Sequence, residues 1–172
     1  PVVAPEAESP LTGERLGVLL LREGLIAPHD MVRALAIASD AGGRFSDILI
    51  ARKAISETTL YQRLAAYTGL GLADLSHPPD ARLVDRLGAA ACLRDNLVPW
   101  RTAGDATVIV TAYPDEFDRH RPDLAAIFGP LILAVAPPQQ IAQAVLSLRG
   151  AALVSRAETC VSPAESCRGF RA

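Results

Sequence analysis

The chain has 172 residues, a formal net charge of −2 and three cysteines. It is long enough to bury a core as one domain or two small ones, and its charge balance argues against a general nucleic-acid binder, which normally carries a basic face. No apolar run approaches the ~20 residues that span a bilayer. The odd cysteine count, without CxxC or Cys/His zinc spacing, favours a reducing compartment over a disulfide or zinc framework.

The first part of the chain predicts a helical hairpin. Residues 1–12 are rich in Pro, Ala and Glu and predict a flexible lead-in. From Arg15 apolar residues recur at helical spacing until Gly24, which is typical of a left-handed helix end. A second helix is predicted to begin at Pro28 and to end before 40-DAGG-43.

The same plan follows a second time. A short helix from Phe45 and a break at Ile55 precede an N-cap at Ser56, with Thr59 three residues later, and a longer helix that ends at Gly69. Aligning Arg15 with Arg44 gives an offset of 29 residues. Five apolar pairs then match: Leu16 and Phe45, Leu20 and Leu49, Ile26 and Ile55, Met31 and Leu60, Leu35 and Leu64. The sequence therefore predicts an internal repeat of two helical hairpins.

After residue 69 the pattern changes to alternating strands and helices. The expected strands are 70–75, 96–102, 106–112 and 130–136, with a hairpin turn at 103–105, and the expected helices are 78–87, 114–128 (interrupted or bent at Pro122) and 137–149. The predicted fold class is therefore α+β: a helical lobe over 13–69 and a small α/β lobe over 70–149, with three to four strands and helices against one face. Residues 150–172 are expected to link to a further domain of a longer protein.

No catalytic or metal-binding set emerges from the residue types and spacings. The three histidines are far apart and are predicted to be surface or capping residues: His29, His77 and His120. The acidic group Asp115, Glu116 and Asp118 is predicted to stabilise the first turn of a helix. The stretch 69-GLGLAD-74 lacks the third glycine of a dinucleotide fingerprint, and Trp100 and Tyr113 are predicted to pack in the core or between the lobes. This part of the protein is therefore not expected to be an enzyme.

The repeated pattern R-L-G-x-x-L-x-x-x-G-x-I/L-x(4)-L/M-x(3)-L, followed by 74-DLSHPPD-80 and 135-VAPPQQI-141, resembles the MshEN or GspE N-terminal domain. The resemblance covers roughly residues 13–149. That module precedes type II secretion and type IV pilus assembly ATPases, and it also precedes membrane-bound family 2 glycosyltransferases. The segment 151–172 looks more like the approach to the membrane region of such a transferase.

In ligand-binding members of this family the paired motifs bind cyclic di-GMP (cdg). The resemblance implies that Arg supplies a planar fork for guanine, Gly lets the base approach the backbone, and Leu residues form an apolar bed. The implied ligand-binding residues are Arg15, Leu16, Gly17, Leu20, Gly24, Ile26, Met31, Leu35, Arg44, Leu49, Ile55, Leu60 and Leu64.

The second copy departs from the pattern at positions tied to the ligand. Phe45 replaces a Leu, Ser46 and Lys53 replace both glycines, and Tyr67 replaces the terminal Gln, where Ala38 stands in the first copy. The expected function is a non-catalytic regulatory and docking domain of a larger membrane-associated protein, most simply a family 2 glycosyltransferase. The alternative is a working cyclic di-GMP sensor of an assembly ATPase.

The expected partners are the downstream catalytic domain of the same protein and a membrane assembly protein. No nucleic acid and no direct membrane insertion are expected. Apart from cyclic di-GMP as a regulatory ligand, no cofactor or metal is expected. The expected location is the cytoplasm, at the inner face of the membrane.

Overall fold

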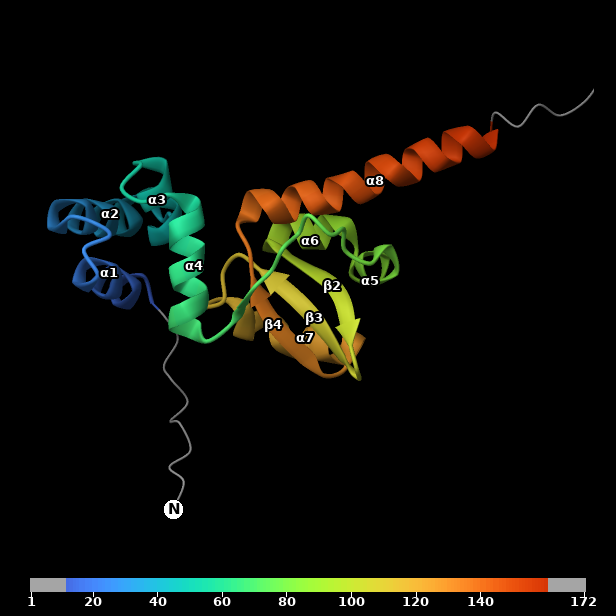
Figure 1. Ribbon diagram of the computed structural model, residues 1–172, viewed down its shortest axis with the longest axis horizontal. Helices are drawn as coiled ribbons and strands as arrows, with labels where there is room; N and C mark the ends of the chain where they lie inside the picture. The colour runs from blue at the N-terminus through green and yellow to red at the C-terminus, as the bar shows by residue number, and fades with distance from the viewer. Residues whose placement is uncertain (1–11, 161–172) are drawn as a thin grey trace, which may run out of the picture.

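The structure, a computed structural model, describes the backbone of residues 12–160 and the side chains of residues 12–150. It has two lobes, a helical one and one built on a sheet (Figure 1). The helical lobe holds α1 (Gly13–Arg22), α2 (Pro28–Ala41), α3 (Phe45–Ala51) and α4 (Glu57–Thr68). The second lobe holds β1 (Gly71–Leu72), α5 (Ala81–Leu87), α6 (Ala89–Asp95), β2 (Leu97–Ala103), β3 (Ala106–Thr111), α7 (Phe117–Phe128), β4 (Leu131–Val135) and α8 (Pro138–Cys160). The predicted α+β fold class and its two-hairpin helical lobe are confirmed.

The two helical hairpins are built alike down to their backbone hydrogen bonds. At the end of α1 the amide of Leu25 donates to the carbonyl of Leu20 at 3.0 Å, and at the end of α3 Ala54 donates to Leu49, also at 3.0 Å. This six-residue closure is the Schellman ending, which satisfies carbonyls that a helix end leaves open. The predicted N-cap of α4 is also present, since Ser56 Oγ accepts from the amide of Thr59 at 3.1 Å.

The sheet has the strand order β1-β4-β3-β2. The β2–β3 pair is an antiparallel hairpin, whereas β3–β4 and β1–β4 are parallel pairs. The register of β2 shifts between Pro99 and Arg101, where Pro99 has no amide to donate and the strand lies at the sheet edge. The crossover from β3 to β4 runs through α7, as a parallel connection requires.

Helices cover both faces of the sheet, so the expectation of helices on one face was wrong. Val98, Val110 and Ala134 share a core with α6 and α8. Alternate residues such as Ile109 pack instead with Phe117 and other residues of α7. Because side chains alternate across a strand, these two clusters lie on opposite faces of the sheet. In Figure 1, α7 lies behind the sheet, whereas α6 and α8 lie along its upper end.

Several predicted boundaries differ from those observed. The strand expected over 70–75 pairs only at β1, and α6 was not expected at all. Pro122 lies inside α7, which is helical without a break. The last helix continues from Pro138 to Cys160, beyond the expected end at residue 149, and its last turns project from the body of the molecule (Figure 1).

Candidate functional site

The apolar motif residues form the core of the helical lobe. Leu16, Leu20, Ile26, Leu49, Ile55, Leu60 and Leu64 are buried in one cluster, with Met31 and Leu35 packed against it. Their positions in both hairpins explain why the apolar repeat persists, because each hairpin needs the same buried stripe. Whether any of them also contacts a ligand stays a prediction.

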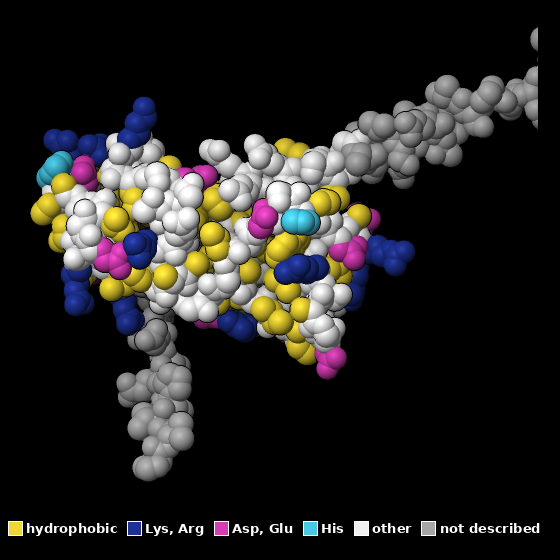
Figure 2. Space-filling model, in the orientation of Figure 1, with side chains coloured by type: hydrophobic (Ala, Val, Ile, Leu, Met, Phe, Trp, Pro, Cys, Tyr) yellow, Lys and Arg dark blue, Asp and Glu magenta, His cyan; other side chains and the backbone are white. Residues whose placement is uncertain are grey.

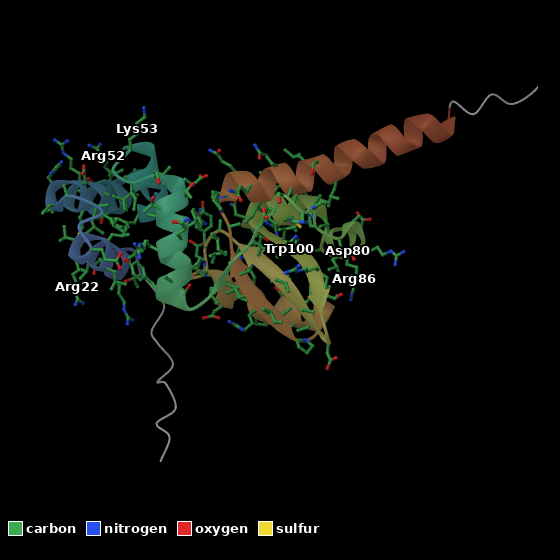
Figure 3. All side chains as sticks on the ribbon, in the orientation of Figure 1. Arg22, Arg52, Lys53, Asp80, Arg86 and Trp100 are labelled. Atoms are coloured by element: carbon green, nitrogen blue, oxygen red, sulfur yellow. The ribbon has the colours of Figure 1, made fainter. Side chains whose placement is uncertain are left out.

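The two helix-end positions of the motif share one backbone conformation despite different residues. Gly24 has φ of 69° and Lys53 has φ of 57°, both in the left-handed region. Lys53 therefore occupies a backbone conformation that is energetically unfavourable for any L-residue with a side chain. Its side chain points away from the lobe at the outer end of α3 (Figure 3).

Gly17 and Gly13 of α1 seat the ring of Phe45. A Cβ atom added to Gly17 would lie 2.9 Å from Cζ of Phe45, and one added to Gly13 would lie 2.8 Å from its Cβ. Met31 closes the same space, with its Cε 3.1 Å from a Cβ on Gly17. The glycine face that the resemblance assigned to a guanine is thus packed against a residue of the second copy, and Gly17 itself is buried.

Arg44 joins the helical lobe to the α/β lobe. Its Nε donates to Oε1 of Glu116 at 3.2 Å and its Nη2 to Oε2 at 2.8 Å, a bidentate pair that we call the interlobe ion pair. The guanidinium also stacks on Tyr113, with Cζ 3.8 Å from the ring centroid. Arg44 is the N-cap residue of α3, whereas Tyr113 and Glu116 lie between β3 and α7.

Two further hydrogen bonds cross the same junction. Tyr113 donates its hydroxyl to Oδ2 of Asp47, in the first turn of α3, at 2.9 Å. Tyr61 of α4 donates its hydroxyl to the carbonyl of Ala112 at 3.2 Å, and this bond is buried. Both tyrosines are buried side chains, so the loop from Ala112 to Glu116 is held to the helical lobe at three points.

The pKa values of these groups follow from their neighbours. The hydrogen bonds from Arg44 lower the pKa of Glu116, although partial burial acts in the opposite direction. The hydrogen bond to Glu116 in turn raises the pKa of Arg44. Burial, reinforced by the bond to Asp47, raises the pKa of Tyr113, which therefore remains a donor at neutral pH.

Two pockets meet at the interlobe ion pair. One pocket, of about 240 Å³, lies between the lobes and is called here the junction pocket. It is lined by Gly13, Leu16, Gly43, Arg44, Phe45, Ser46, Leu64 and residues 112–116. A second pocket of about 500 Å³, the outer pocket, is lined by Gly42, Gly43, Arg44, Asp47, Ile48, Ala51 and Glu116. Arg44 and Glu116 line both, so the ion pair forms their common wall.

The structure gathers only part of the predicted site around these pockets. Leu16, Arg44 and Leu64 line the junction pocket. Arg15 lies on an exposed face in the first turn of α1, and Gly24 lies at its far end. Sequence reasoning missed Asp47 and Glu116, and it assigned Glu116 only to the start of a helix; its sole signal was an acidic residue beside a predicted lobe-packing tyrosine.

The Tyr67 that replaces the terminal Gln is half-buried on α4. Burial, with a smaller contribution from Glu23, raises the pKa of Tyr67 to about 12. Its hydroxyl oxygen is buried without a hydrogen bond of normal geometry. The ring of Tyr67 packs against the core of the helical lobe at a position where the family pattern has an amide.

No group of three or more His, Cys, Asp or Glu side chains within the described residues could hold a metal ion. Cys92 is buried in the α/β core, and burial raises the pKa of its thiol to about 11. No helix within residues 12–160 is long and apolar enough to cross a membrane. On the face seen in Figure 2, several basic side chains lie at the outer edge of the helical lobe, and acidic and basic side chains are mixed over the rest.

Comparison with solved structures shows the same two-lobe domain elsewhere. The structure of MshE with cdg has a TM-score of 0.66 and 26% identity, and the match covers 77% of this chain and 97% of that one. The N-terminal domain of XpsE has a TM-score of 0.64 and 22% identity, and the match covers 78% of this chain and 94% of that one, which shows a shared fold. No curated protein is similar to the chain by sequence.

These matches define the class of this protein by its fold, a two-lobe α+β fold shared with MshE and with the N-terminal domain of XpsE. The family model of the MshEN domain matches residues 67–154, just over half of the chain. The chain therefore belongs to the MshEN domain family. The matched region is the end of α4 and the α/β lobe, so the helical lobe with its degraded motif lies mostly outside it.

Proposed function

We propose that this domain is a non-catalytic regulatory and docking module that couples its helical lobe to its α/β lobe and through α8 to the rest of a larger protein. The observation that carries the proposal is Arg44, whose guanidinium is bound across the junction by Glu116 and Tyr113. A residue that the family motif associates with ligand serves here to join two lobes. A change in either lobe then reaches the other through this contact and through the two tyrosine hydrogen bonds beside it.

The larger protein is proposed to be a membrane-associated family 2 glycosyltransferase, and a secretion or pilus assembly ATPase is the alternative. Its own catalytic domain and a membrane assembly protein are the proposed partners, and the inner face of the membrane is the proposed location. The sequence after this segment separates the two parents. A GxxxxGK[ST] loop would identify an ATPase, whereas apolar spans with an Asp-rich nucleotide-sugar site would identify a transferase.

Deleting residues 13–149 from the parent protein tests the regulatory role. We expect the deletion to change the parent's activity or its recovery in the membrane fraction. An enzyme that keeps both its activity and its location after the deletion would leave the module without a regulatory or docking role.

A second candidate function is cyclic di-GMP sensing. It is favoured by the similarity to MshE with cdg, which spans most of both chains, and by a junction pocket whose lining includes the motif residues Leu16, Arg44 and Leu64. The junction pocket is smaller than the about 300–1,000 Å³ usual for drug-sized ligands, so binding at this junction would require some opening.

Titration calorimetry with cyclic di-GMP tests this candidate. Binding that is lost in Arg15→Ala and in Arg44→Ala would support it. Val32→Ser, at an exposed position of α2 that is not one of the implied ligand-binding residues, is a matched control and should leave binding unchanged. No heat at high protein concentration, under several salt conditions, would rule out sensing and leave docking as the function.

A further inference from the structure

The interlobe ion pair occupies the edge of Arg44 that an anionic ligand would use. The resemblance assigns the planar fork of Arg44 to a guanine of the ligand, and the same fork of parallel N–H groups also binds a carboxylate or a phosphate. In this structure Nε and Nη2 already donate to both carboxylate oxygens of Glu116. Because the same two donors cannot serve a second anion at full strength, Glu116 competes with any phosphate-bearing ligand for Arg44.

The pair can open without breaking the junction. The side chains of Arg44 and Glu116 are 42% and 35% exposed, so water can replace the contact at low cost. The other two contacts, from Tyr61 to Ala112 and from Tyr113 to Asp47, involve buried tyrosines. They would keep the beginning of the loop in place as its Glu116 end moves.

The position of the pair determines what its opening would do. Arg44 and Glu116 form the common wall of the junction pocket and the outer pocket, so their separation would join the two spaces. Glu116 directly precedes α7, whose first residue Phe117 is buried in the core against the sheet. Movement of Glu116 would therefore be felt at the N-terminus of α7.

We infer that Glu116 is an internal competitor for Arg44. Its ion pair with Arg44 holds the two lobes together, and we call this contact the latch. An anionic phosphodiester ligand binds Arg44 only by displacing Glu116, and this displacement transmits ligand binding to α7. This inference rests on the proposed sensing function for its ligand. It adds a residue from the α/β lobe that controls ligand access and transmits the result.

Two substitutions of Glu116 test the latch against cyclic di-GMP and against inorganic pyrophosphate as a simple anion. Glu116→Gln keeps the shape and removes the charge, and Glu116→Ala removes the contact. Both should bind cyclic di-GMP about three- to fivefold more tightly than the wild type, which is the factor that an exposed ion pair of up to about 1 kcal/mol supplies. Arg44→Ala should lose binding of both probes.

The matched control is Asp118→Asn. Asp118 forms an ion pair with Arg121 inside α7, at 3.0 Å, with both side chains mostly exposed. The substitution removes one carboxylate two residues from Glu116 without touching the junction, so it should leave ligand affinity unchanged. A gain in this control equal to that of Glu116→Gln would mean a general charge effect and would overturn the latch.

Amide hydrogen exchange provides a readout that does not depend on ligand. Residues 112–117 should exchange faster in both Glu116 variants than in the wild type or in Asp118→Asn, and wild-type protein with ligand should show the same increase. If the wild type binds cyclic di-GMP and the two Glu116 variants bind it no more tightly, this inference is overturned and the sensing function is not. If neither the wild type nor any variant binds cyclic di-GMP, sensing and displacement are both overturned. If amide exchange of residues 112–117 is the same in the Glu116 variants as in the wild type, the ion pair does not hold the lobes together.

Discussion

Lys53 shows how a position can keep its backbone conformation and lose its preferred residue. Gly24 and Lys53 both close a helix with a left-handed residue, and their hydrogen bonds to the preceding helix are equivalent. The helix-end hydrogen bonds that the hairpin turn requires are thus present even where Lys53 replaces the glycine that this backbone conformation favours. Glycine is the residue that adopts this region without a steric penalty.

Replacing Lys53 by glycine should therefore stabilise the domain. We expect Lys53→Gly to raise the free energy of unfolding by about 0.5–1 kcal/mol, because relief of a left-handed conformation costing ~1–2 kcal/mol outweighs the greater freedom of glycine in the unfolded chain. Gly24→Ala should lower it by about 1 kcal/mol for the converse reason. Urea unfolding of both variants at pH 7 measures the effect; a loss of stability in Lys53→Gly would contradict it.

The two short helices of the repeat pack through a large residue set against small ones. Phe45 of α3 lies over Gly13 and Gly17, one turn apart on α1. A Leu at this position, as in the first copy, would leave part of that face uncovered. The Phe in the second copy and the glycines of the first therefore form one packing unit, which neither copy reveals when read alone.

Gly17→Ala should be destabilising, and part of the loss should be recovered in a Phe45→Leu background. The added methyl would meet the ring at 2.9 Å, and overpacking of this kind typically costs about 1–3 kcal/mol. The effects of substitutions at neighbouring residues in contact deviate from additivity by ~0.5–3 kcal/mol. The loss of unfolding free energy caused by Gly17→Ala should therefore be smaller by at least ~0.5 kcal/mol when Leu replaces Phe45.

Gly150→Ala is the matched control for this pair. Gly150 lies in helix α8 and a Cβ added there meets nothing within 4 Å, so alanine should raise stability there by up to about 1 kcal/mol. Denaturant midpoints of the four variants give the comparison. Equal costs for Gly17→Ala with Phe and with Leu at residue 45 would show that the ring is not what fills this space.

The whole molecule is held together by contacts of unequal strength. The interlobe ion pair is partly exposed, whereas the bond from Tyr61 to Ala112 is buried. Val135 of β4 belongs to the core of the helical lobe, which ties the sheet directly to α4. The lobes thus share buried contacts, with an exposed ionic contact beside them.

Tyr61→Phe should weaken the domain more than Glu116→Gln. Loss of the hydroxyl leaves the buried carbonyl of Ala112 without its side-chain donor, at a cost of about 1–3 kcal/mol, whereas an exposed ion pair contributes about 0.2–1 kcal/mol. Thermal unfolding of both variants gives the ranking. The reverse ranking would show that the ionic contact dominates the junction.

The contribution of Glu116 should depend on pH. Its folded-state pKa is lowered, chiefly by its hydrogen bond with Arg44 and further by Arg119 and His120. Its stabilising effect is therefore complete above the unfolded pKa of about 4.3 and is lost as pH falls through the lowered folded pKa. Tyr113 and Asp47 also interact electrostatically with Arg44, as do Tyr61 and Asp115, whose own pKa is raised chiefly by burial.

The measurement is the stability difference between wild type and Glu116→Gln across pH 7 to 3. The difference should be constant from pH 7 to about pH 5 and should shrink below pH 4. High salt should reduce it at neutral pH, since an exposed pair is screened. If the stability difference between wild type and Glu116→Gln grows on acidification, the folded-state pKa of Glu116 is raised and not lowered.

Local signals account for what the sequence could predict. Helical spacing, Gly24, Ser56 and the offset of 29 residues lie within short windows, and the structure confirms the hairpins they imply. The interlobe ion pair joins residues 72 positions apart. It depends on a parallel sheet order that places the loop after β3 beside α3, and no short window contains that order. Glu116 alone carried the signal of an ordinary helix start.

The short strand β1 has a consequence for how the chain folds. Gly71 pairs with Ala134, 63 residues later, whereas the helical hairpins and the β2–β3 hairpin close over short loops. Contacts between distant residues carry a larger loop-closure cost and form slowly. We therefore expect the helical hairpins and the β2–β3 hairpin to form early, and the joining of the two lobes, which needs β4 in place between β1 and β3, to be the rate-limiting event.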